Sequence, residues 1–413
     1  MGQPTVTFYG AHWCPDCRRS KQFLGEHQIP YRWVDIEQDP AGEQYVIQKN
    51  NGKRIIPTIE FPDGSILVEP TNAELAAKLG LKTTAQRSHY DLIIVGGGPA
   101  GLTAALYAAR EGIDALVIER AALGGQAATT ERLDNVPGFA EGIEGAVFGD
   151  RLRQQAARFG AELLQAQEVA KVHGHDNYHC VDNKDRSQYS ARALLLATGS
   201  RYRRLGAPGE DTYVGAGIHF CATCDAPFYK GMPVAVVGGG NSAAEESLFL
   251  VKFADRVTLL VRGEELKASQ AIREKILRHP QVDIRFQTEV VRFDGVGGKL
   301  KSVTIKNRLS GATEVLHPAG VFVFVGQIPN TAFLADSGVR RDRWGYIIAG
   351  HDLLHSGDRP PAYEKREPSC LETSVPGIFA AGDVRAGSTK QIASASGEGA
   401  TAALQIREYL KTT

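Results

Sequence analysis

The hydrophobic positions of the first 80 residues change their period several times along the chain. Polar and apolar side chains alternate over residues 5–9 and again over 31–36, which predicts two short strands, whereas residues 15–26 have the apolar spacing of a helix. The pattern then predicts a helix over 41–49, a strand over 57–61, a turn at 62–64, a strand over 66–69 and a helix over 72–79. We therefore expect a small α/β domain over residues 1–82.

The rest of the chain repeats one pattern twice. A polar segment at 83–88, TTAQRS, has no apolar period and is predicted to be a linker. Beyond it the chain reads as a strand, a glycine-rich turn and a helix, first at YDLIIVGGGPAGLTAALYAAR (90–110) and again at PVAVVGGGNSAAEESLFLVK (233–252). Two Rossmann-like dinucleotide-binding domains are implied.

Further apolar runs complete these two domains. They predict strands over 193–197 and 321–325 and a closing helix near 391–409. The second domain is expected over 206–328, inserted in a first domain that is made of 89–205 and 329–413. The predicted fold class is α/β throughout, with the small domain at the N-terminus.

The first glycine turn carries a complete dinucleotide signature. Gly96, Gly98 and Gly101 follow a strand directly, so the backbone can approach a pyrophosphate and present it to the N-terminus of the next helix, at Pro99 and Ala100. Glu119 closes the following strand about 20 residues later, where a carboxylate suits a ribose hydroxyl.

The second glycine turn differs at the acidic position. Gly238, Gly240 and Ala243 repeat the spacing, but the next strand, over 256–261, ends without a carboxylate and is followed by Arg262. A cation at this point favours the 2′-phosphate of NADPH, and Lys267 adds a second positive charge. The neighbouring residues expected at this nucleotide are Asn241, Ser242 and Glu246.

Composition and charge limit the classes of binding partner that we expect. The 413 residues hold 47 Lys and Arg against 47 Asp and Glu, without a block of like charge, so we expect no nucleic-acid or membrane partner. The N-terminus lacks the pattern of a signal peptide and no stretch reaches the length of a membrane span, which predicts a cytoplasmic protein. Four of the six cysteines form two Cys-x-x-Cys pairs, Cys14 with Cys17 and Cys221 with Cys224, whereas Cys180 and Cys370 are expected to be small apolar side chains.

Residues 90–410 resemble the low-molecular-weight thioredoxin reductase family. The resemblance rests on Cys221-Ala-Thr-Cys224-Asp225 between two dinucleotide folds, with GGGPAG at 96–101, GGQ at 124–126, Asn135 before Pro137-Gly138, ATGS at 197–200, GGGNSAAEE at 238–246 and AGDV at 381–384. It implies bound FAD, NADPH as reductant and a homodimer. The further FAD contacts that it implies are Gly125, Gln126, Asn135, Gly199, Asp383, Lys390, Gln391 and Ile392.

The resemblance also assigns roles at the second Cys-x-x-Cys pair. Cys224 would face the flavin, Cys221 would attack the acceptor disulfide, and Asp225 would give and take protons. A carboxyl group suits that role because breaking a disulfide generates thiolates. The sequence departs from the family where a His-Arg-Arg-Asp run is usual, since it has Val261-Arg262-Gly263-Glu264 there, and it carries an insertion over 351–368. That insertion is expected to screen the flavin, to contact a partner, or to be a surface loop.

Residues 1–82 resemble glutaredoxins of the mycoredoxin kind, and their order of elements is that of the thioredoxin fold. The resemblance rests on Trp13-Cys14-Pro15-Asp16-Cys17, Val34-Asp35-Ile36, Ile56-Pro57-Thr58 and Asp63-Gly64. Cys14, at a helix N-terminus that favours the thiolate, is predicted to be the nucleophile, Cys17 the resolving thiol and Pro57 a cis-proline. A zinc site built from both cysteine pairs is the alternative; because no Cys/His pattern at zinc spacing joins them, we expect no metal.

The sequence thus predicts an electron route from NADPH to FAD, to Cys221 and Cys224, to Cys14 and Cys17, and on to an external disulfide. Electron transfer from Cys221 and Cys224 to Cys14 and Cys17 would be favourable by roughly 2 to 3 kcal/mol if each pair has the reduction potential usual for its class. The sequence does not decide whether the final electron acceptor is a thioredoxin or glutaredoxin-type protein, a peroxiredoxin or a low-molecular-weight thiol disulfide. Two other interpretations are a peroxiredoxin reductase like the flavoprotein of alkyl hydroperoxide reductases, and a flavin redox sensor without turnover.

Overall fold

The computed structural model describes residues 6–11, 13–27, 29–130, 133, 135–175, 178–355 and 359–412. The chain divides into two compact units. The first comprises residues 1–128, 146–199 and 331–413, and the second comprises 129–145 and 200–330. Each unit is described by itself below.

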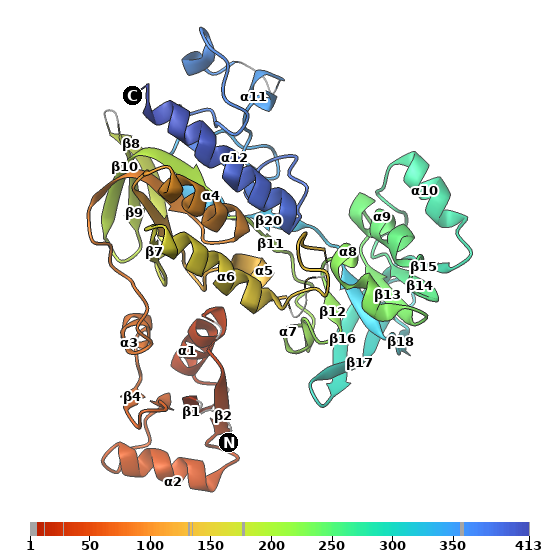
Figure 1. Cartoon of the computed structure of the whole chain (residues 1–413). Helices are drawn as coiled ribbons and strands as arrows, with labels where there is room; N and C mark the ends of the chain where they lie inside the picture. Colours follow the sequence, from red (N-terminus) through yellow and green to blue (C-terminus); the bar gives the residue numbers. More distant parts are fainter. Residues whose placement is uncertain are drawn as a thin grey trace. The chain divides into compact units, whose positions relative to one another are not determined.

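The N-terminal module of the first unit has the predicted order of elements (Figure 1). Its sheet has the order β2-β1-β3-β4, with β1 parallel to β2 and antiparallel to β3. The elements are β1 (Val6–Gly10), α1 (Pro15–Glu26), β2 (Tyr31–Asp35), α2 (Pro40–Lys49), β3 (Thr58–Glu60), β4 (Ile66–Val68) and α3 (Asn72–Lys78). Phe8, Leu24, Ile59 and Leu75 are fully buried between the sheet and its helices. The predicted thioredoxin fold is confirmed.

The segment 83–88 contains no helix or strand, as its composition predicts. It is nevertheless held in place by hydrogen bonds. The side chain of Glu162 accepts from the backbone N–H of Gln86 over 2.8 Å and from the hydroxyl of Tyr90 over 2.6 Å, and it pairs with Lys82 Nζ over 2.7 Å. The linker is therefore anchored to the surface of the larger domain of the first unit.

That larger domain is built on a mainly parallel sheet. The strand order is β7-β6-β5-β10-β9-β8, and β21 pairs with β10. The strands are β5 (His89–Val95), β6 (Ala115–Ile118), β7 (Glu162–Leu164), β8 (Val169–His175), β9 (Tyr178–Asn183), β10 (Gln188–Leu196) and β21 (Ile378–Ala380). The helices are α4 (Pro99–Arg110), α5 (Gly125–Ala128), α6 (Gly145–Arg158) and α12 (Ile392–Leu410), and the 351–368 insertion contains α11 (Asp352–His355) and a 3₁₀ turn, η3 (Pro361–Tyr363).

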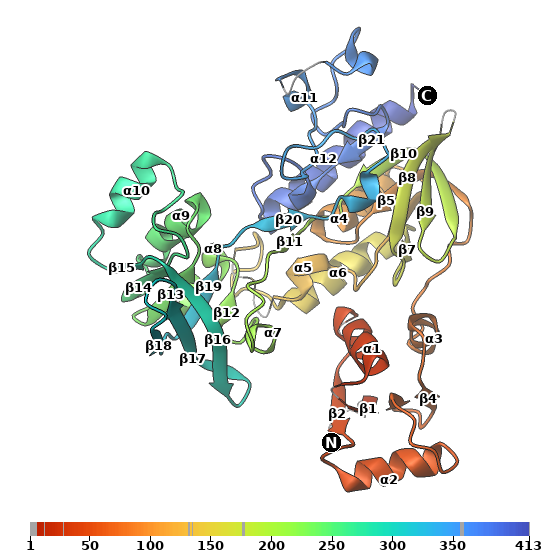
Figure 2. The ribbon, with the colours of Figure 1, turned by 180° about the vertical axis from the view of Figure 1, so that it is seen from behind.

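Both faces of this sheet are covered, which explains the unbroken apolar run of β5. Leu92 and Ile94 pack in a cluster with α4 and α12, whereas Ile93 and Val95 pack on the opposite face. Parallel strands buried on both faces need apolar side chains at every position. Helices α4 and α12 lie side by side in both views (Figures 1 and 2), although they are almost 300 residues apart.

The second unit contains the second Rossmann-like sheet. Its parallel strands follow the order β12 (Ile218–His219), β19 (Gly320–Val323), β13 (Pro233–Val237), β14 (Arg256–Leu260) and β15 (Val282–Arg285). The helices that matter for the site are α8 (Ala222–Asp225), α9 (Asn241–Leu250) and α10 (Gln270–Leu277), and a 3₁₀ turn, η1 (Ala226–Tyr229), follows α8. An antiparallel sheet of β16 (Thr288–Val296), β17 (Lys299–Asn307) and β18 (Thr313–Leu316) and a pair of β11 (Ser200–Tyr202) with β20 (Gln327–Pro329) complete the unit.

The predicted element boundaries hold to within one or two residues at both glycine turns. The strand predicted over 321–325 ends at Val323, because its neighbour β13 ends at Val237 and turns into the glycines there. Among the described residues, no helix has both the length and the apolar character needed to cross a bilayer.

Candidate active site

The first dithiol lies at the start of α1. Cys14 is the N-cap residue of this helix, and its sulfur accepts a hydrogen bond from the backbone N–H of Cys17 over 3.1 Å. Pro15 occupies the first turn, where no N–H is needed, and Asp16 adds a negative charge there. The Ile56–Pro57 peptide bond is cis, as predicted, and the carbonyl oxygen of Ile56 lies 3.8 Å from the Cys14 sulfur.

The two thiols of this pair have different surroundings. Cys17 is fully buried, and burial together with its hydrogen bond to Cys14 raises the pKa of Cys17 to about 12. Thiols react as thiolates, so a buried, protonated thiol is unreactive until its partner has reacted. Beside the pair, the indole of Trp13 is 59% exposed and donates to Glu37 over 2.9 Å. Both sulfurs are buried, with Cys14 3% and Cys17 0% exposed, and Cys14 is the one that caps the helix.

The first glycine turn has the shape that a pyrophosphate requires. A Cβ atom at Gly101 would come within 1.9 Å of the carbonyl oxygen of Gly96, and Gly96 itself has a φ of +108°, so both positions need glycine. A Cβ atom at Gly98 would meet no atom closer than 3.9 Å. Open space therefore lies over Gly98, at the N-cap of α4, whose first residues are Pro99 and Ala100.

Glu119 lies beside this turn as predicted. Its carboxylate accepts from the backbone N–H of Gly97 over 2.7 Å and from that of Ala121 over 2.8 Å. Desolvation raises the pKa of Glu119, while these two donors act against that shift by favouring the ionised form. The carboxylate is thus fixed at the end of β6, where a ribose hydroxyl would be expected.

The C-terminal residues predicted to contact the flavin come to the same turn. A Cβ atom at Gly382 would lie 3.0 Å from the Cβ of Ala100, which places Asp383 next to the start of α4. Burial raises the pKa of Asp383, and Lys390 opposes this shift. Lys390 Nζ donates to the carbonyl oxygen of Asp383 over 2.7 Å, and Gln391 and Ile392 are the N-cap and first residue of α12.

The remaining predicted flavin residues fall in three places. Gly125 faces the turn, because a Cβ atom there would lie 3.0 Å from the Cα of Gly98, and Gln126 follows it in α5. Gly199, with a φ of +64°, follows the end of β10. Asn135 belongs to the segment 129–145, which groups with the second unit. Within the first unit, the glycine turn, Glu119 and Asp383 form a cradle that fits a dinucleotide.

The second Cys-x-x-Cys pair lies on α8. Cys221, which directly precedes this helix, is disulfide-bonded, and its carbonyl oxygen accepts from the backbone N–H of Asp225 over 3.2 Å. The side chain of Cys224 lies outside the part that the structure describes. Asp225 Oδ2 lies 3.3 Å from His219 Nδ1, and His219 Nε2 lies 2.6 Å from the hydroxyl oxygen of Tyr229. The sequence analysis missed His219 and Tyr229, because no periodic or motif signal marks either residue.

The second glycine turn repeats the first in its packing. A Cβ atom at Gly238 would come within 2.4 Å of the carbonyl oxygen of Phe324, whereas one at Gly240 would meet nothing within 4 Å. Ala243 is fully buried against this turn. Asn241 and Ser242, the first residues of α9, are exposed, and burial, followed by the charge of Glu245, raises the pKa of the half-buried Glu246. The open space over Gly240 fits a second pyrophosphate.

Three basic residues are linked to this turn or to the residues after β14 by contacts with the backbone, and one of them, Arg308, also pairs with Glu289 over 3.4 Å. Arg262 is exposed at the end of β14, and the backbone N–H of Lys267 donates to the carbonyl oxygen of Gly239 over 2.7 Å. Arg308, from the hairpin between β17 and β18, donates from Nη1 to the carbonyl oxygen of Arg262 over 3.3 Å. It was not predicted, since nothing in the local sequence links position 308 to position 262.

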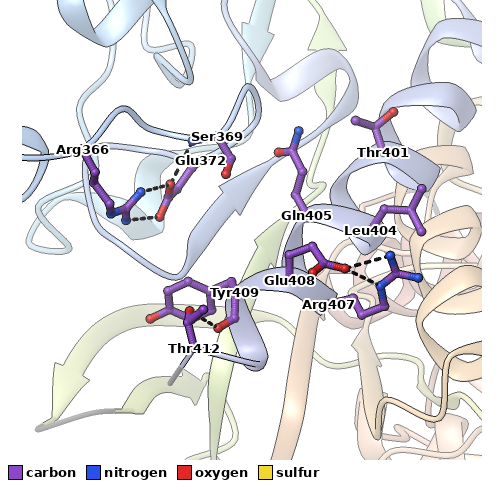
Figure 3. A pocket seen from close by; sticks show the side chains of 10 residues that line it. All are labelled: Arg366, Ser369, Glu372, Thr401, Leu404, Gln405, Arg407, Glu408, Tyr409 and Thr412. Atoms are coloured by element: carbon purple, nitrogen blue, oxygen red, sulfur yellow. Dashed lines mark hydrogen bonds and ion pairs between the residues drawn. The ribbon is translucent and has the colours of Figure 1, made fainter.

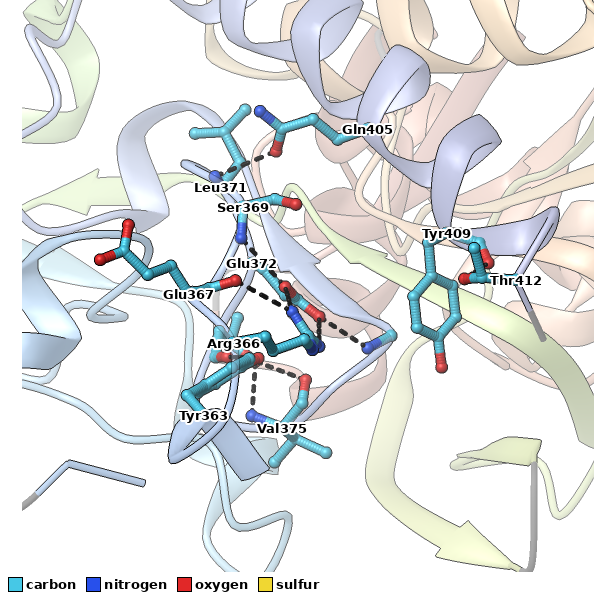
Figure 4. Close-up of polar contacts among 12 residues, drawn as sticks. Tyr363, Arg366, Glu367, Ser369, Leu371, Glu372, Val375, Gln405, Tyr409 and Thr412 are labelled. Carbon is cyan, nitrogen blue, oxygen red and sulfur yellow. Dashed lines mark hydrogen bonds and ion pairs between the residues drawn. The ribbon is translucent and has the colours of Figure 1, made fainter. Parts of the chain in front are cut away.

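The described part of the insertion, residues 351–355 and 359–368, is packed against the rest of the chain. Tyr363 is fully buried, and its hydroxyl donates to the carbonyl oxygen of Thr373 over 2.5 Å. Arg366 stacks on the Tyr363 ring and makes two hydrogen bonds, of 2.7 and 2.8 Å, with the buried carboxylate of Glu372 (Figure 4). The insertion is thus fixed to the chain that follows it.

A pocket of about 610 Å³ lies between this insertion and the end of α12 (Figure 3). Arg366 and Glu372 line one wall, and Gln405, Arg407 and Glu408 line the other. Its cations are already paired with carboxylates, so the pocket has no excess charge for an ionic ligand.

Comparison with known proteins agrees with this geometry. A sequence profile described as pyridine nucleotide-disulphide oxidoreductase matches residues 90–399. The chain belongs to this family. A glutaredoxin profile matches residues 6–66, so a pyridine nucleotide-disulphide oxidoreductase here carries an N-terminal glutaredoxin domain.

Relatives of this oxidoreductase are thioredoxin reductases. That of Treponema pallidum is 39% identical over 324 residues, which are 78% of this chain and 98% of that protein, and that of Bacillus subtilis is 35% identical over 322 residues, 78% of this chain and 95% of that protein. The crystal structure of the Streptococcus pyogenes enzyme aligns with a TM-score of 0.70 at 35% identity, covering 79% of this chain and 99% of that one. The family acts on disulfides, and its thioredoxin reductases depend on FAD and NADPH.

Proposed function

We propose that this oxidoreductase is an NADPH-dependent flavoprotein that reduces its own N-terminal dithiol domain and, through it, external disulfides. The observation that carries the proposal is the contrast between Cys14 and Cys17. Cys14 caps a helix and Cys17 has a raised pKa, which suits a domain in which the first thiol attacks a disulfide and the second then resolves the mixed disulfide. Such a domain is fused here to a disulfide reductase.

The two glycine turns would hold the cofactors. FAD would be held by Gly96, Gly98, Pro99, Ala100, Gly101, Glu119, Gly125, Gln126, Asn135, Gly199, Asp383, Lys390, Gln391 and Ile392, and NADPH by Gly238, Gly240, Asn241, Ser242, Ala243, Glu246, Arg262 and Lys267. We add Arg308 to the second set, because it supplies the cation that Gly263 lacks. When bound, FAD supplies a two-electron carrier between the nicotinamide and the disulfide of the second cysteine pair.

The step between the two dithiols needs only residues of this chain. Cys221, as a thiolate, attacks Cys14 in the Cys14–Cys17 disulfide, which forms a Cys221–Cys14 bond and releases Cys17, which takes up a proton because of its raised pKa. Cys224 then attacks Cys221, closing the Cys221–Cys224 disulfide and releasing Cys14. One disulfide forms and one breaks, so two electrons reach the N-terminal domain. Asp225 takes the proton of the Cys221 thiol before the first attack, and the proton of Cys224 passes to the Cys14 thiolate that the second attack releases.

Anaerobic titration with NADPH, and separately with NADH, tests this proposal. Flavin absorbance is followed and the new thiols at each pair are counted in the wild type, in Cys221→Ser and in Cys370→Ser, which removes an exposed thiol outside both pairs. We expect the wild type and Cys370→Ser to gain thiols at both pairs, and Cys221→Ser to leave Cys14 and Cys17 oxidised. Flavin that stays oxidised with both nucleotides would overturn the reductase assignment.

The final acceptor is part of the same proposal. We place protein disulfides of the thioredoxin and glutaredoxin type first, since the relatives are thioredoxin reductases and the fused domain is a glutaredoxin. A peroxiredoxin with peroxide and a low-molecular-weight thiol disulfide are compared in the same assay by nucleotide consumption. We further propose that the protein is cytoplasmic, because dithiols that must return to the reduced state suit a reducing compartment. We also propose that it is a homodimer, as the resemblance to thioredoxin reductases implies.

A further inference from the structure

His219 stands between two polar side chains beside the second cysteine pair. Its Nδ1 atom lies 3.3 Å from Asp225 Oδ2 and its Nε2 atom lies 2.6 Å from the hydroxyl oxygen of Tyr229. The side chains of His219 and Asp225 are only 10% and 13% exposed. His219 therefore bridges the other two side chains, through a close polar contact with Asp225 and a hydrogen bond with Tyr229, and the His219 and Asp225 side chains are largely shielded from water.

The surrounding residues fix the imidazole in this position. His219 is paired with Phe322 across β12 and β19, and the two rings lie 5.3 Å apart. The Tyr229 ring packs edge-on against both His219 and Phe322. Gly320 makes room for Tyr229, since a Cβ atom there would come within 2.5 Å of the tyrosine ring. The imidazole is therefore bounded by a fully buried aromatic side chain and by the two groups that it bonds.

Which of these atoms donates and which accepts depends on whether Asp225 carries a proton. When Asp225 is ionised, Nδ1–H of His219 donates to the carboxylate and Nε2 accepts from the Tyr229 hydroxyl. When Asp225 is protonated, its O–H donates to Nδ1, and Nε2–H donates to the Tyr229 oxygen. A neutral imidazole satisfies both states by changing its tautomer. The carboxyl group can therefore gain and lose a proton without losing its hydrogen bond.

From this geometry we infer that His219 is a positioning residue for Asp225. It holds the carboxyl group on the helical turn that begins at Cys221, in a position to receive a proton from the attacking thiol. The inference rests on the proposed function, in which Asp225 exchanges that proton. Tyr229 is the anchor that keeps His219 in place.

His219→Phe in the full-length flavoprotein tests the inference. The probe is the small disulfide 5,5′-dithiobis(2-nitrobenzoate), and the rate of its reduction by the NADPH-reduced enzyme is measured from pH 5 to 9. Phenylalanine removes a polar partner from the Asp225 carboxyl group, so the midpoint of the pH profile should move away from that of the wild type. The rate at neutral pH should fall about tenfold or more.

Two controls separate positioning from folding. His219→Asn keeps a donor toward Asp225 and should retain the wild-type midpoint. His173→Phe removes a His–Asp pair of the same 3.3 Å separation, with Asp182, from the other unit, and should change nothing. Flavin reduction by NADPH, which does not involve Asp225, reports that each variant is folded.

The outcomes distinguish this inference from the function on which it rests. A wild type that reduces no disulfide would overturn the proposed function itself. A wild type that reduces the probe, with a His219→Phe variant of equal rate and equal pH midpoint, would overturn the role of His219 alone.

Discussion

The backbone N–H of Cys17 points at the sulfur of Cys14 and donates to it over 3.1 Å. This donor belongs to the first turn of α1, where helix amides have no partner within the helix. The same turn buries both cysteines, and burial, followed by the hydrogen bond to Cys14, raises the pKa of Cys17.

We predict that alkylation separates the two thiols by pH. A pKa of about 12 for Cys17 keeps its thiol protonated at all lower pH values, and the thiolate fraction falls tenfold for each pH unit below it. In a reduced Cys14→Ser variant, where burial remains but the Cys14 thiol is gone, iodoacetamide should therefore still modify Cys17 at least about tenfold more slowly at pH 7 than an ordinary thiol of pKa about 8.5. Mass spectrometry of timed samples measures the rate. The same variant in denaturant is the control, and rapid labelling of its folded form would contradict the prediction.

Two glycines of α12 should respond oppositely to alanine. Gly399 is buried, and a Cβ atom there would come within 2.2 Å of the Ala100 carbonyl oxygen on α4. Gly397, two residues earlier, is exposed and its Cβ atom would meet nothing within 4 Å. We expect Gly399→Ala to lower the free energy of unfolding by about 1–3 kcal/mol through overpacking, and Gly397→Ala to raise it by up to ~1 kcal/mol through helix propensity.

Urea denaturation measures both glycine variants. Because Ala100 is among the residues that we propose to hold FAD, Gly399→Ala should in addition be purified with less FAD than the wild type. Equal stability and equal flavin content in the two variants would show that α12 and α4 do not pack as closely as described.

The Arg308 side chain should contribute to the choice of nucleotide. It lies on the Arg262 carbonyl at the end of β14, where the sequence has Gly263 in place of a second arginine. We expect Arg308→Leu to weaken binding of 2′,5′-ADP about tenfold, the loss typical of one charge-assisted contact, and to leave the KM for NADH unchanged. Calorimetry gives the first value and steady-state kinetics the second. Arg256→Leu, at the opposite end of the same strand, is the matched control.

The Arg366–Glu372 pair should determine how firmly the insertion is held. Glu372 is 1% exposed, so removing its partner leaves a buried charge that two backbone N–H groups stabilise only in part. Because Arg366 is itself 44% exposed, we expect Arg366→Leu to cost about 2 kcal/mol rather than the larger penalty of a fully buried pair.

Limited proteolysis and urea denaturation check this expectation. Cleavage within residues 351–368 should accelerate in Arg366→Leu, and the double variant Arg366→Leu/Glu372→Met should recover part of the lost stability. Arg407→Leu, on the opposite wall of the pocket, breaks partly exposed ion pairs with Glu408 and Glu111 and should lower stability by no more than about 1 kcal/mol. Unchanged cleavage in Arg366→Leu would mean that Tyr363 alone anchors the insertion.

The sequence by itself determined the parts whose signals are local. Glycine spacing after a strand, an N-cap before a helix and a Cys-x-x-Cys pair each depend on a few consecutive residues, and both dinucleotide folds and the helix after Cys14 were predicted from them. The cis bond at Pro57 was predicted from the resemblance to glutaredoxins. These features are local because turns, caps and helix starts are fixed by backbone conformation over a few residues.

Only the tertiary structure decided which distant residues meet. His219 and Tyr229 join Asp225 because β12 lies beside β19 and a 3₁₀ turn follows α8, and Arg308 reaches Arg262 across 46 residues because a hairpin folds back to the end of β14. The pKa of Cys17 likewise follows from burial, which no run of letters displays. Hydrogen bonds and electrostatic interactions depend on distances between side chains, and those distances are set by strand order and packing rather than by spacing along the chain.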